Sequence, residues 1–128
     1  MENNEQLKNV ILVSSFIEVQ AFLKDFHAKY RQHDIVFMEE KMNNTNVLLS
    51  LDIAALEKRE IIESVLPIDY SAGPLNDQHF GNASIWVFGK FSKQQELLIK
   101  LSAGRLNSSV VCLAFLAADK TLLYPYKN

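Results

Sequence analysis

The sequence predicts a mixed α+β domain, a two-layer sandwich in which helices pack against one β-sheet. Its 128 residues suit a single globular domain covering residues 1–128. Its composition, 48% hydrophobic and 22% charged, is typical of a soluble globular protein and excludes a disordered or fibrous chain. Short β-branched runs alternate with apolar stripes at three- and four-residue steps, and this alternation predicts the element order β-α-β-β-α-β-α-β-β.

The first two predicted elements are a strand and a helix. Residues 1–8 are polar and acidic, so we expect a flexible tail there. Asn9–Ser14 is a β-branched run and predicts a buried strand. Ser15 and Glu18 match the capping box that begins a helix, in which each side chain accepts from the other residue's backbone amide. The apolar stripe of this helix contains Phe16, Val19, Leu23, Phe26 and Tyr30.

A hairpin and a second helix are expected next. Ile35–Met42 and Asn46–Ile53 read as two strands joined by Asn43-Asn44-Thr45, because asparagine tolerates the left-handed backbone of a tight turn. Asp52 is placed to cap the second helix. Pro67 ends this helix, since proline disfavours helical geometry in the residue before it.

Pro67–Asn82 is predicted to be one long loop. Two of the four glycines and two of the three prolines lie within these residues, and neither helical nor strand periodicity is visible. Loops of this length are uncommon in compact domains and tend to be functional or disordered. We therefore expect the segment 67–82 to carry binding residues.

The last third of the chain contains three predicted strands and one predicted helix. Ser84–Phe91 is aromatic and β-branched, and Ser109–Ala117 is almost wholly apolar, as in a strand covered on both faces. Thr121–Tyr126 is expected at a sheet edge, where the missing amide of its proline is tolerated.

The predicted third helix begins at a second capping-box match, Ser92-Lys93-Gln94-Gln95, and ends at Gly104. Its apolar residues are Leu97, Leu98 and Leu101. The first six predicted elements follow the order of the ferredoxin-like split βαβ unit, and this helix begins an α-β-β extension. That order is shared by many unrelated activities and therefore predicts no function.

The net charge and the number of cysteines limit which cellular compartment and which classes of partner we expect. Thirteen basic against fifteen acidic residues give a formal charge of -2, so no overall field attracts nucleic acid or an anionic membrane. The single cysteine cannot form an internal disulfide. The longest apolar run, Val110–Ala118, is about half the length of a membrane helix. We expect a cytoplasmic protein that binds neither nucleic acid nor membrane.

The sequence contains no motif that predicts a catalytic residue, a metal site or a cofactor. Cys112 lies in the most apolar strand and is expected to be buried and unreactive. His27 and His33 lack the spacing of a helical zinc site. The serines form no nucleophile elbow, and the glycines are too far apart for a phosphate-binding loop.

Five residues are the candidates for binding. Asp69, Tyr70, Asp77 and His79 lie in the predicted loop, where a carboxylate and an imidazole close in sequence could also share a metal or a proton. Trp86 is the fifth, because tryptophan is enriched at binding hot spots, although an aromatic residue on a strand is more often part of the core.

By elimination, the leading hypothesis is a non-enzymatic protein-interaction domain, of an inhibitor, immunity or antitoxin type. Acidic residues at Glu39-Glu40 and at Glu57, Glu60 and Glu63 would favour a basic partner protein. The alternative is a regulatory domain that dimerises through its sheet and binds a small ligand. A third, less favoured hypothesis is an enzyme that uses the segment 67–82.

Overall fold

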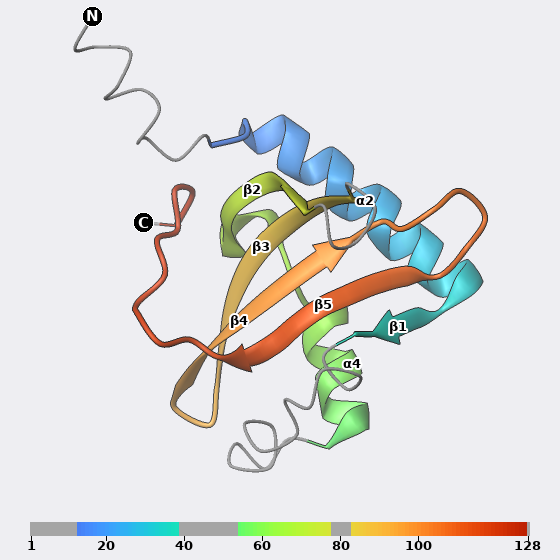
Figure 1. The fold of residues 1–128 in the computed structure, drawn as a ribbon. Helices are drawn as coiled ribbons and strands as arrows, with labels where there is room; N and C mark the ends of the chain where they lie inside the picture. The colour runs from blue at the N-terminus through green and yellow to red at the C-terminus, as the bar shows by residue number, and fades with distance from the viewer. Residues whose placement is uncertain (1–12, 39–53, 78–82, 128) are drawn as a thin grey trace, which may run out of the picture.

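The computed structural model describes residues 13–38, 54–77 and 83–127. Within these ranges the chain forms two α-helices, one 3-10 helix and a five-stranded mixed sheet (Figure 1). The predicted mixed α+β class is therefore confirmed. The elements are α2 (Phe16–His33), β1 (Ile35–Phe37), α4 (Ala55–Glu63), η2 (Pro67–Asp69), β2 (Tyr70–Asp77), β3 (Ala83–Ser92), β4 (Gln95–Ser102) and β5 (Val110–Ala117).

The sheet is an antiparallel meander with one parallel strand added. Its strand order is β1-β5-β4-β3-β2, so consecutive strands from β2 to β5 are neighbours. β1 runs parallel to β5, with Ile35 opposite Val110. This arrangement makes β1 and β2 the two edges of the described sheet. The ferredoxin-like order is not confirmed, because β2 lies between α4 and β3 where no strand was expected, and the strands expected at 9–14 and 46–53 lie mostly outside the described residues.

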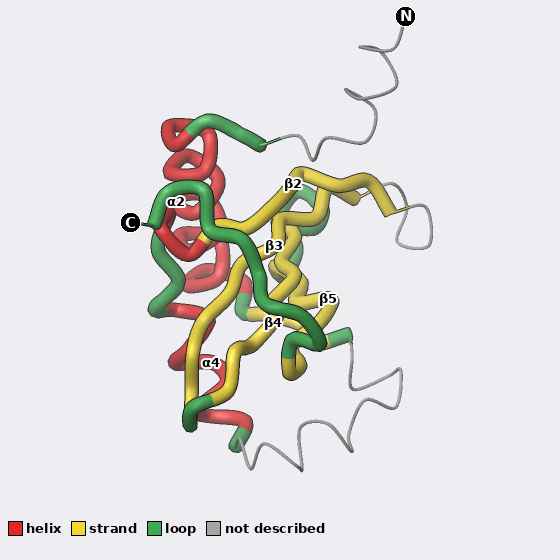
Figure 2. The backbone as a smooth tube through the Cα atoms, turned by 90° about the vertical axis from the view of Figure 1, so that its left-hand side faces the viewer, coloured by secondary structure: helices red, strands yellow, loops and turns green. Residues whose placement is uncertain are grey.

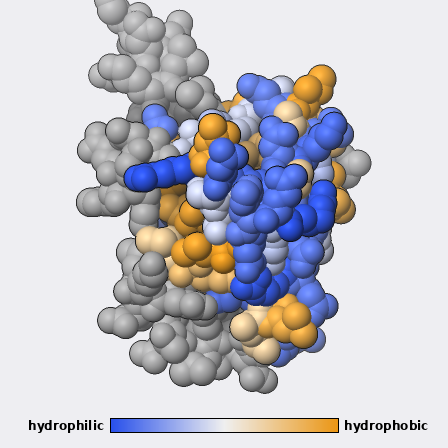
Figure 3. Space-filling view, turned by 90° about the vertical axis from the view of Figure 1, so that its right-hand side faces the viewer, coloured by the Kyte–Doolittle hydropathy of each residue, from blue (hydrophilic) through white to orange (hydrophobic). Residues whose placement is uncertain are grey.

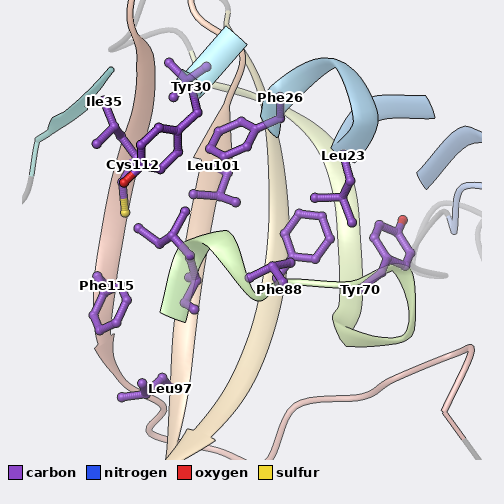
Figure 4. Packing of buried hydrophobic residues seen from close by; sticks show 14 of the residues in the cluster. Leu23, Phe26, Tyr30, Ile35, Tyr70, Phe88, Leu97, Leu101, Cys112 and Phe115 are labelled. Atoms are coloured by element: carbon purple, nitrogen blue, oxygen red, sulfur yellow. The ribbon is translucent and has the colours of Figure 1, made fainter. Parts of the chain in front are cut away.

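Both helices cover the same face of the sheet (Figure 2). The register places Phe88 opposite Ile99 and Ile99 opposite Phe115, so these three fully buried side chains form a row beneath the helices. Leu23 and Phe26 of α2 point onto this row (Figure 4). The main core therefore lies between one helical layer and one face of the sheet.

The first helix begins as the sequence predicts. Ser15 Oγ accepts from the Glu18 amide at 3.1 Å, and Glu18 Oε1 accepts from the Ser15 amide at 2.8 Å. The second helix begins two residues later than expected. Its N-cap is Ala54, which makes no side-chain hydrogen bond, so the prediction of an Asp52 cap is wrong. The buried residues of the stripe are Val19, Leu23, Phe26 and Tyr30.

The prediction of one long loop over 67–82 is wrong for the residues that the structure describes there. η2 is followed directly by β2, which pairs with β3 through two irregularities in register. Gly73 has φ +111°, and a Cβ there would lie 2.6 Å from the Ile85 carbonyl oxygen. Pro74 is tolerated because β2 is an edge strand. Glycine and proline therefore mark a distorted edge strand. Residues 78–82 lie outside the described ranges.

The predicted third helix is a strand. Lys93 and Gln94 adopt positive φ angles of 52° and 65°, as in a two-residue hairpin turn, and β4 follows at once. Leu97, Ile99 and Leu101 alternate along β4 and are all fully buried. These apolar residues recur at every second position, which is the periodicity of a strand. The capping-box match at residues 92–95 therefore does not begin a helix.

The predicted last strand, Thr121–Tyr126, is also wrong. We call residues 118–127 the C-terminal strap, because they run irregularly across the edge of the sheet (Figure 2). The Ala118 amide still donates to the Glu96 carbonyl oxygen, but the Leu122 amide donates to the Glu96 carboxylate, so a side chain holds the middle of this segment. β3 and β5 confirm the strands expected at 84–91 and 109–117.

Some predictions fall outside the described residues. These are the tail at 1–8, most of the strand at 9–14, and the hairpin that was expected to follow β1 through 39–53. Val13, the first described residue, forms an isolated parallel bridge with Gly73. Among the described residues, no helix is long and apolar enough to cross a membrane.

Candidate functional site

The structure separates the predicted binding residues that it describes. Asp69 and Tyr70 lie where η2 meets β2, whereas Asp77 is the last residue of the same eight-residue strand. A strand rises about 3.3 Å per residue, so the seven steps from Tyr70 to Asp77 span about 23 Å. His79 lies outside the described residues. The four residues of the segment 67–82 are therefore not shown to share one site.

Asp69 is an internal anchor. Its side chain is 3% exposed, with Lys90 Nζ at 2.9 Å and Lys127 Nζ at 3.6 Å from its carboxylate. It also accepts from the Leu66 amide at 2.8 Å. A buried carboxylate needs opposite charges and donors of this kind to remain ionised. Because Lys127 comes from the strap, this carboxylate ties the end of the chain to the start of β2.

A second buried carboxylate holds the middle of the strap. Glu96 Oε2 accepts from the Tyr124 hydroxyl at 2.6 Å, and Glu96 Oε1 accepts from the Leu122 amide at 3.2 Å. Burial and this hydrogen bond to Glu96 raise the pKa of Tyr124. Gly89 leaves the space that the Tyr124 ring occupies against β3. We call Asp69, Lys90, Glu96, Tyr124 and Lys127 the strap lock.

Tyr70 and Trp86 are packing residues in this structure. Tyr70 is fully buried, and its hydroxyl donates to the Gly73 carbonyl while accepting from the Ser14 amide at 3.0 Å. Trp86 stacks on Phe22 of α2, with ring centroids 4.6 Å apart and planes 11° apart. Both rings therefore join the helical layer to the sheet.

The open surface of the helical layer contains a hollow of about 530 Å³ beside α2. One wall is α2, and the other is the chain that leaves α4. Leu23 and Val65, both nearly fully buried, form its apolar floor. Leu66 at the rim is 53% exposed. The other lining residues are Gln20, Lys24, His27, Glu63 and Pro67.

A second hollow of about 720 Å³ continues along α2 toward its C-terminal end. Glu63 lines both hollows. We call the two together the α2 groove. Its second half is lined by Tyr30, Arg31, Gln32, His33, Asp34 and Glu63. Figure 3 faces the side where α2 ends, and hydrophilic residues cover much of it.

One ion pair closes the far end of the α2 groove. Arg59 Nη1 donates to Asp34 Oδ1 at 2.6 Å, and this hydrogen bond holds the pKa of Asp34 below its usual range. The Ile35 amide donates to the same carboxylate at 2.8 Å. Burial raises the pKa of Tyr30, which lies beside this pair.

The remaining charges of the groove are not paired within the described residues. Lys24, Arg31 and Glu63 are exposed and form no ion pair there, in contrast to Asp34 and Arg59. His27 Nε2 lies 3.2 Å from the Ile62 carbonyl oxygen, which joins α2 to α4 beneath the groove. Such unpaired charges beside an apolar floor can contact a second molecule.

Sequence reasoning missed this groove because residues far apart in the chain form it. The only local signal is the spacing of Gln20, Lys24 and His27, which puts three polar side chains on one side of α2 next to the buried stripe. Nothing in the sequence indicates that residues 63–67 lie opposite them.

Other candidates are structural in the described part of the chain. Cys112 is fully buried, as predicted. Of the acidic residues suggested as a rim, Glu57 lies 3.8 Å from Lys93, Glu63 lines the α2 groove, and Glu39 and Glu40 are outside the described ranges. No group of three or more potential metal ligands occurs among the residues that the structure describes.

Comparisons of the chain with family models, with curated proteins and with solved structures find no match.

Proposed function

We propose that this chain is a non-enzymatic protein-interaction domain that binds a partner protein through the α2 groove. One observation carries the proposal: a hollow beside α2 is bordered by the exposed side chain of Leu66 and by exposed charges that have no ion-pair partner in the described residues. Leaving Lys24, Arg31 and Glu63 in water costs the fold little, and they are available to a partner. An inhibitor, immunity or antitoxin type suits a domain of this size.

A protein fits the groove better than a small ligand does. Sites for small molecules enclose most of the ligand and direct a few rigid polar groups at it. The α2 groove is open to solvent along α2 and is bordered by long side chains such as Lys24 and Arg31. Leu66 adds the exposed apolar contact that interface centres typically use. The small-ligand regulatory dimer is therefore the less supported alternative.

The test compares two identical substitutions, one inside the groove and one outside it. Leu66→Glu places a charge on the groove rim, whereas Leu106→Glu changes a leucine that is 90% exposed in the loop between β4 and β5. Immobilised wild type and both variants are exposed to a lysate of the native source, after matching melting curves show that all three fold.

We expect the wild type and Leu106→Glu to retain the same specific protein and Leu66→Glu to lose it. Retention by all three proteins would place the interface elsewhere and contradict the groove. Absence of any specific partner on the wild type would contradict the proposed function itself.

A further inference from the structure

The α2 groove does not share the acidic excess of the whole chain. The chain has a formal charge of -2. The two hollows are lined by two cations, Lys24 and Arg31, and by two carboxylates, Asp34 and Glu63. Arg59, which is not a lining residue, pairs with Asp34, so Lys24 and Arg31 face the one unpaired carboxylate of Glu63. The balance of unpaired charges is therefore positive even with both groove histidines neutral. A partner that approaches this surface gains most if it presents carboxylates.

The two unpaired cations have a defined spacing. Lys24 and Arg31 are seven residues apart on α2, which is close to two full turns, so they lie on one side of the helix. Seven residues at 1.5 Å each separate their backbones by about 10 Å. Two carboxylates on one side of a polyproline II segment, three residues apart, are separated by about 9 Å.

The apolar part of the groove lies beside Lys24. Leu66 and Pro67 form its exposed rim, above the buried side chains of Leu23 and Val65. A segment that carries only charges would leave this surface in water. An occupant that also presents a leucine-sized side chain would cover it and exclude water from the neighbouring ion pair.

We propose that the α2 groove binds an acidic segment of the partner protein, with carboxylates facing Lys24 and Arg31 and an apolar side chain against Leu66. This inference rests on the proposed function and specifies the chemistry of the partner. Glu63 repels carboxylates, so the part of the segment that passes the middle of the groove, between Lys24 and Arg31, should be uncharged. The acidic surface that the sequence suggested for a basic partner has no counterpart in this groove.

The test uses a synthetic probe and a matched pair of charge reversals. The probe is a fluorescein-labelled twelve-residue peptide that repeats Glu-Pro-Leu, with a Lys-Pro-Leu peptide of equal length as its counterpart. Lys24→Glu changes the groove, and Lys120→Glu changes an exposed lysine of the strap. Each replaces a charge of +1 with -1 and takes the formal charge from -2 to -4, so the two variants differ only in where the charge lies.

Fluorescence anisotropy should show saturable binding of the acidic peptide to the wild type, weakened by added salt. Lys24→Glu should weaken this binding about fivefold to tenfold, and Lys120→Glu should stay within about twofold of the wild type. Equal losses in the two variants, preference for the Lys-Pro-Leu peptide, or failure of the acidic peptide to bind would each overturn the inference. If one of these occurs while Leu66→Glu still loses the native partner, the proposed function stands and only the partner's chemistry is wrong.

Discussion

The strap lock and the α2 groove use the same kinds of side chain in opposite ways. In the lock, Asp69 is 2% exposed and has two lysines and a backbone amide as partners. In the groove, Lys24 and Arg31 are exposed and unpaired within the described residues. The comparison teaches that the type of residue does not distinguish a structural cluster from a binding surface. What distinguishes them is whether the charge is paired and buried or unpaired and exposed.

The physical basis of the difference is desolvation. Removing a carboxylate from water is costly unless opposite charges and donors replace the water, so each member of the lock constrains the others. Charges in an open groove keep their water until a partner displaces it. Substitutions in the lock should therefore change stability, and substitutions in the groove should change binding.

The largest expected effect is at the lock. Asp69→Ala leaves Lys90, which is only 23% exposed, without its carboxylate and removes the acceptor of the Leu66 amide. Breaking a buried pair from one side leaves an uncompensated charge, so we expect a loss of about 3 kcal/mol in the free energy of unfolding. Urea denaturation measures this loss, with Asp119→Ala on the exposed strap as the control. Equal stability of the two variants would mean that the Asp69 cluster is no anchor.

A smaller effect is expected where the strap crosses β3. In Gly89→Ala the new Cβ would overlap the Tyr124 hydroxyl and force it away from Glu96. Losing a hydrogen bond to a buried charged group costs about 1.5–3 kcal/mol. Limited proteolysis should then cleave residues 118–127 faster than in the wild type.

A double variant separates this mechanism from a general defect in β3. If Gly89→Ala acts through Tyr124, then Gly89→Ala combined with Tyr124→Ala should cost little more than Tyr124→Ala alone. Additive losses would show that the alanine at residue 89 disturbs the sheet by another route.

The start of α2 offers a third, milder test, because this helix forms one wall of the groove. Ser15→Ala removes the hydroxyl that accepts from the Glu18 amide. N-cap losses of this kind cost about 0.5–2 kcal/mol. An unchanged urea midpoint would indicate that the capping box contributes nothing to stability.

The sequence predicted correctly those elements that are specified by residues close together in the chain. The capping box at Ser15 and the apolar run of β5 are readable from neighbouring residues alone. Leu97 and Leu101 fit a helix and a strand equally, and Ile99 between them favours the strand that forms. The turn before β4 could not be recognised from the sequence. Lys93 and Gln94 adopt positive φ angles although neither is the asparagine or glycine that usually indicates such a turn.

The parts that could not be predicted depend on contacts between distant residues. The strap is held by Glu96 and Asp69, and neither contact leaves a pattern in residues 118–127. The groove likewise requires residues 63–67 to lie against α2. Asp69 was predicted as a binding residue, and its contacts with Lys90 and Lys127 make it part of the lock in this structure.

The smallest expected effect concerns Asp34, the paired carboxylate inside the groove. Arg59 holds the pKa of Asp34 below its usual range, so the pair contributes stability at pH values above the unfolded pKa of about 3.9. This contribution is lost as the pH falls through the lower pKa of the folded state. The wild type should therefore melt slightly above Asp34→Asn at pH 7, and the difference should vanish at the acid end. A difference in melting temperature that grows on acidification would contradict this assignment.

The central claim, that the α2 groove is the binding surface, is tested most directly by locating a bound partner on the protein. A photo-crosslinking phenylalanine analogue replaces Gln20 on the groove wall in one protein and Phe91, 64% exposed at the far end of β3, in another. After illumination in a lysate of the native source, we predict a single specific adduct with the Gln20 variant, which Leu66→Glu abolishes, and none with the Phe91 variant. An adduct that forms at Phe91, or one at Gln20 that Leu66→Glu leaves unchanged, would contradict the assignment of the α2 groove as the binding surface.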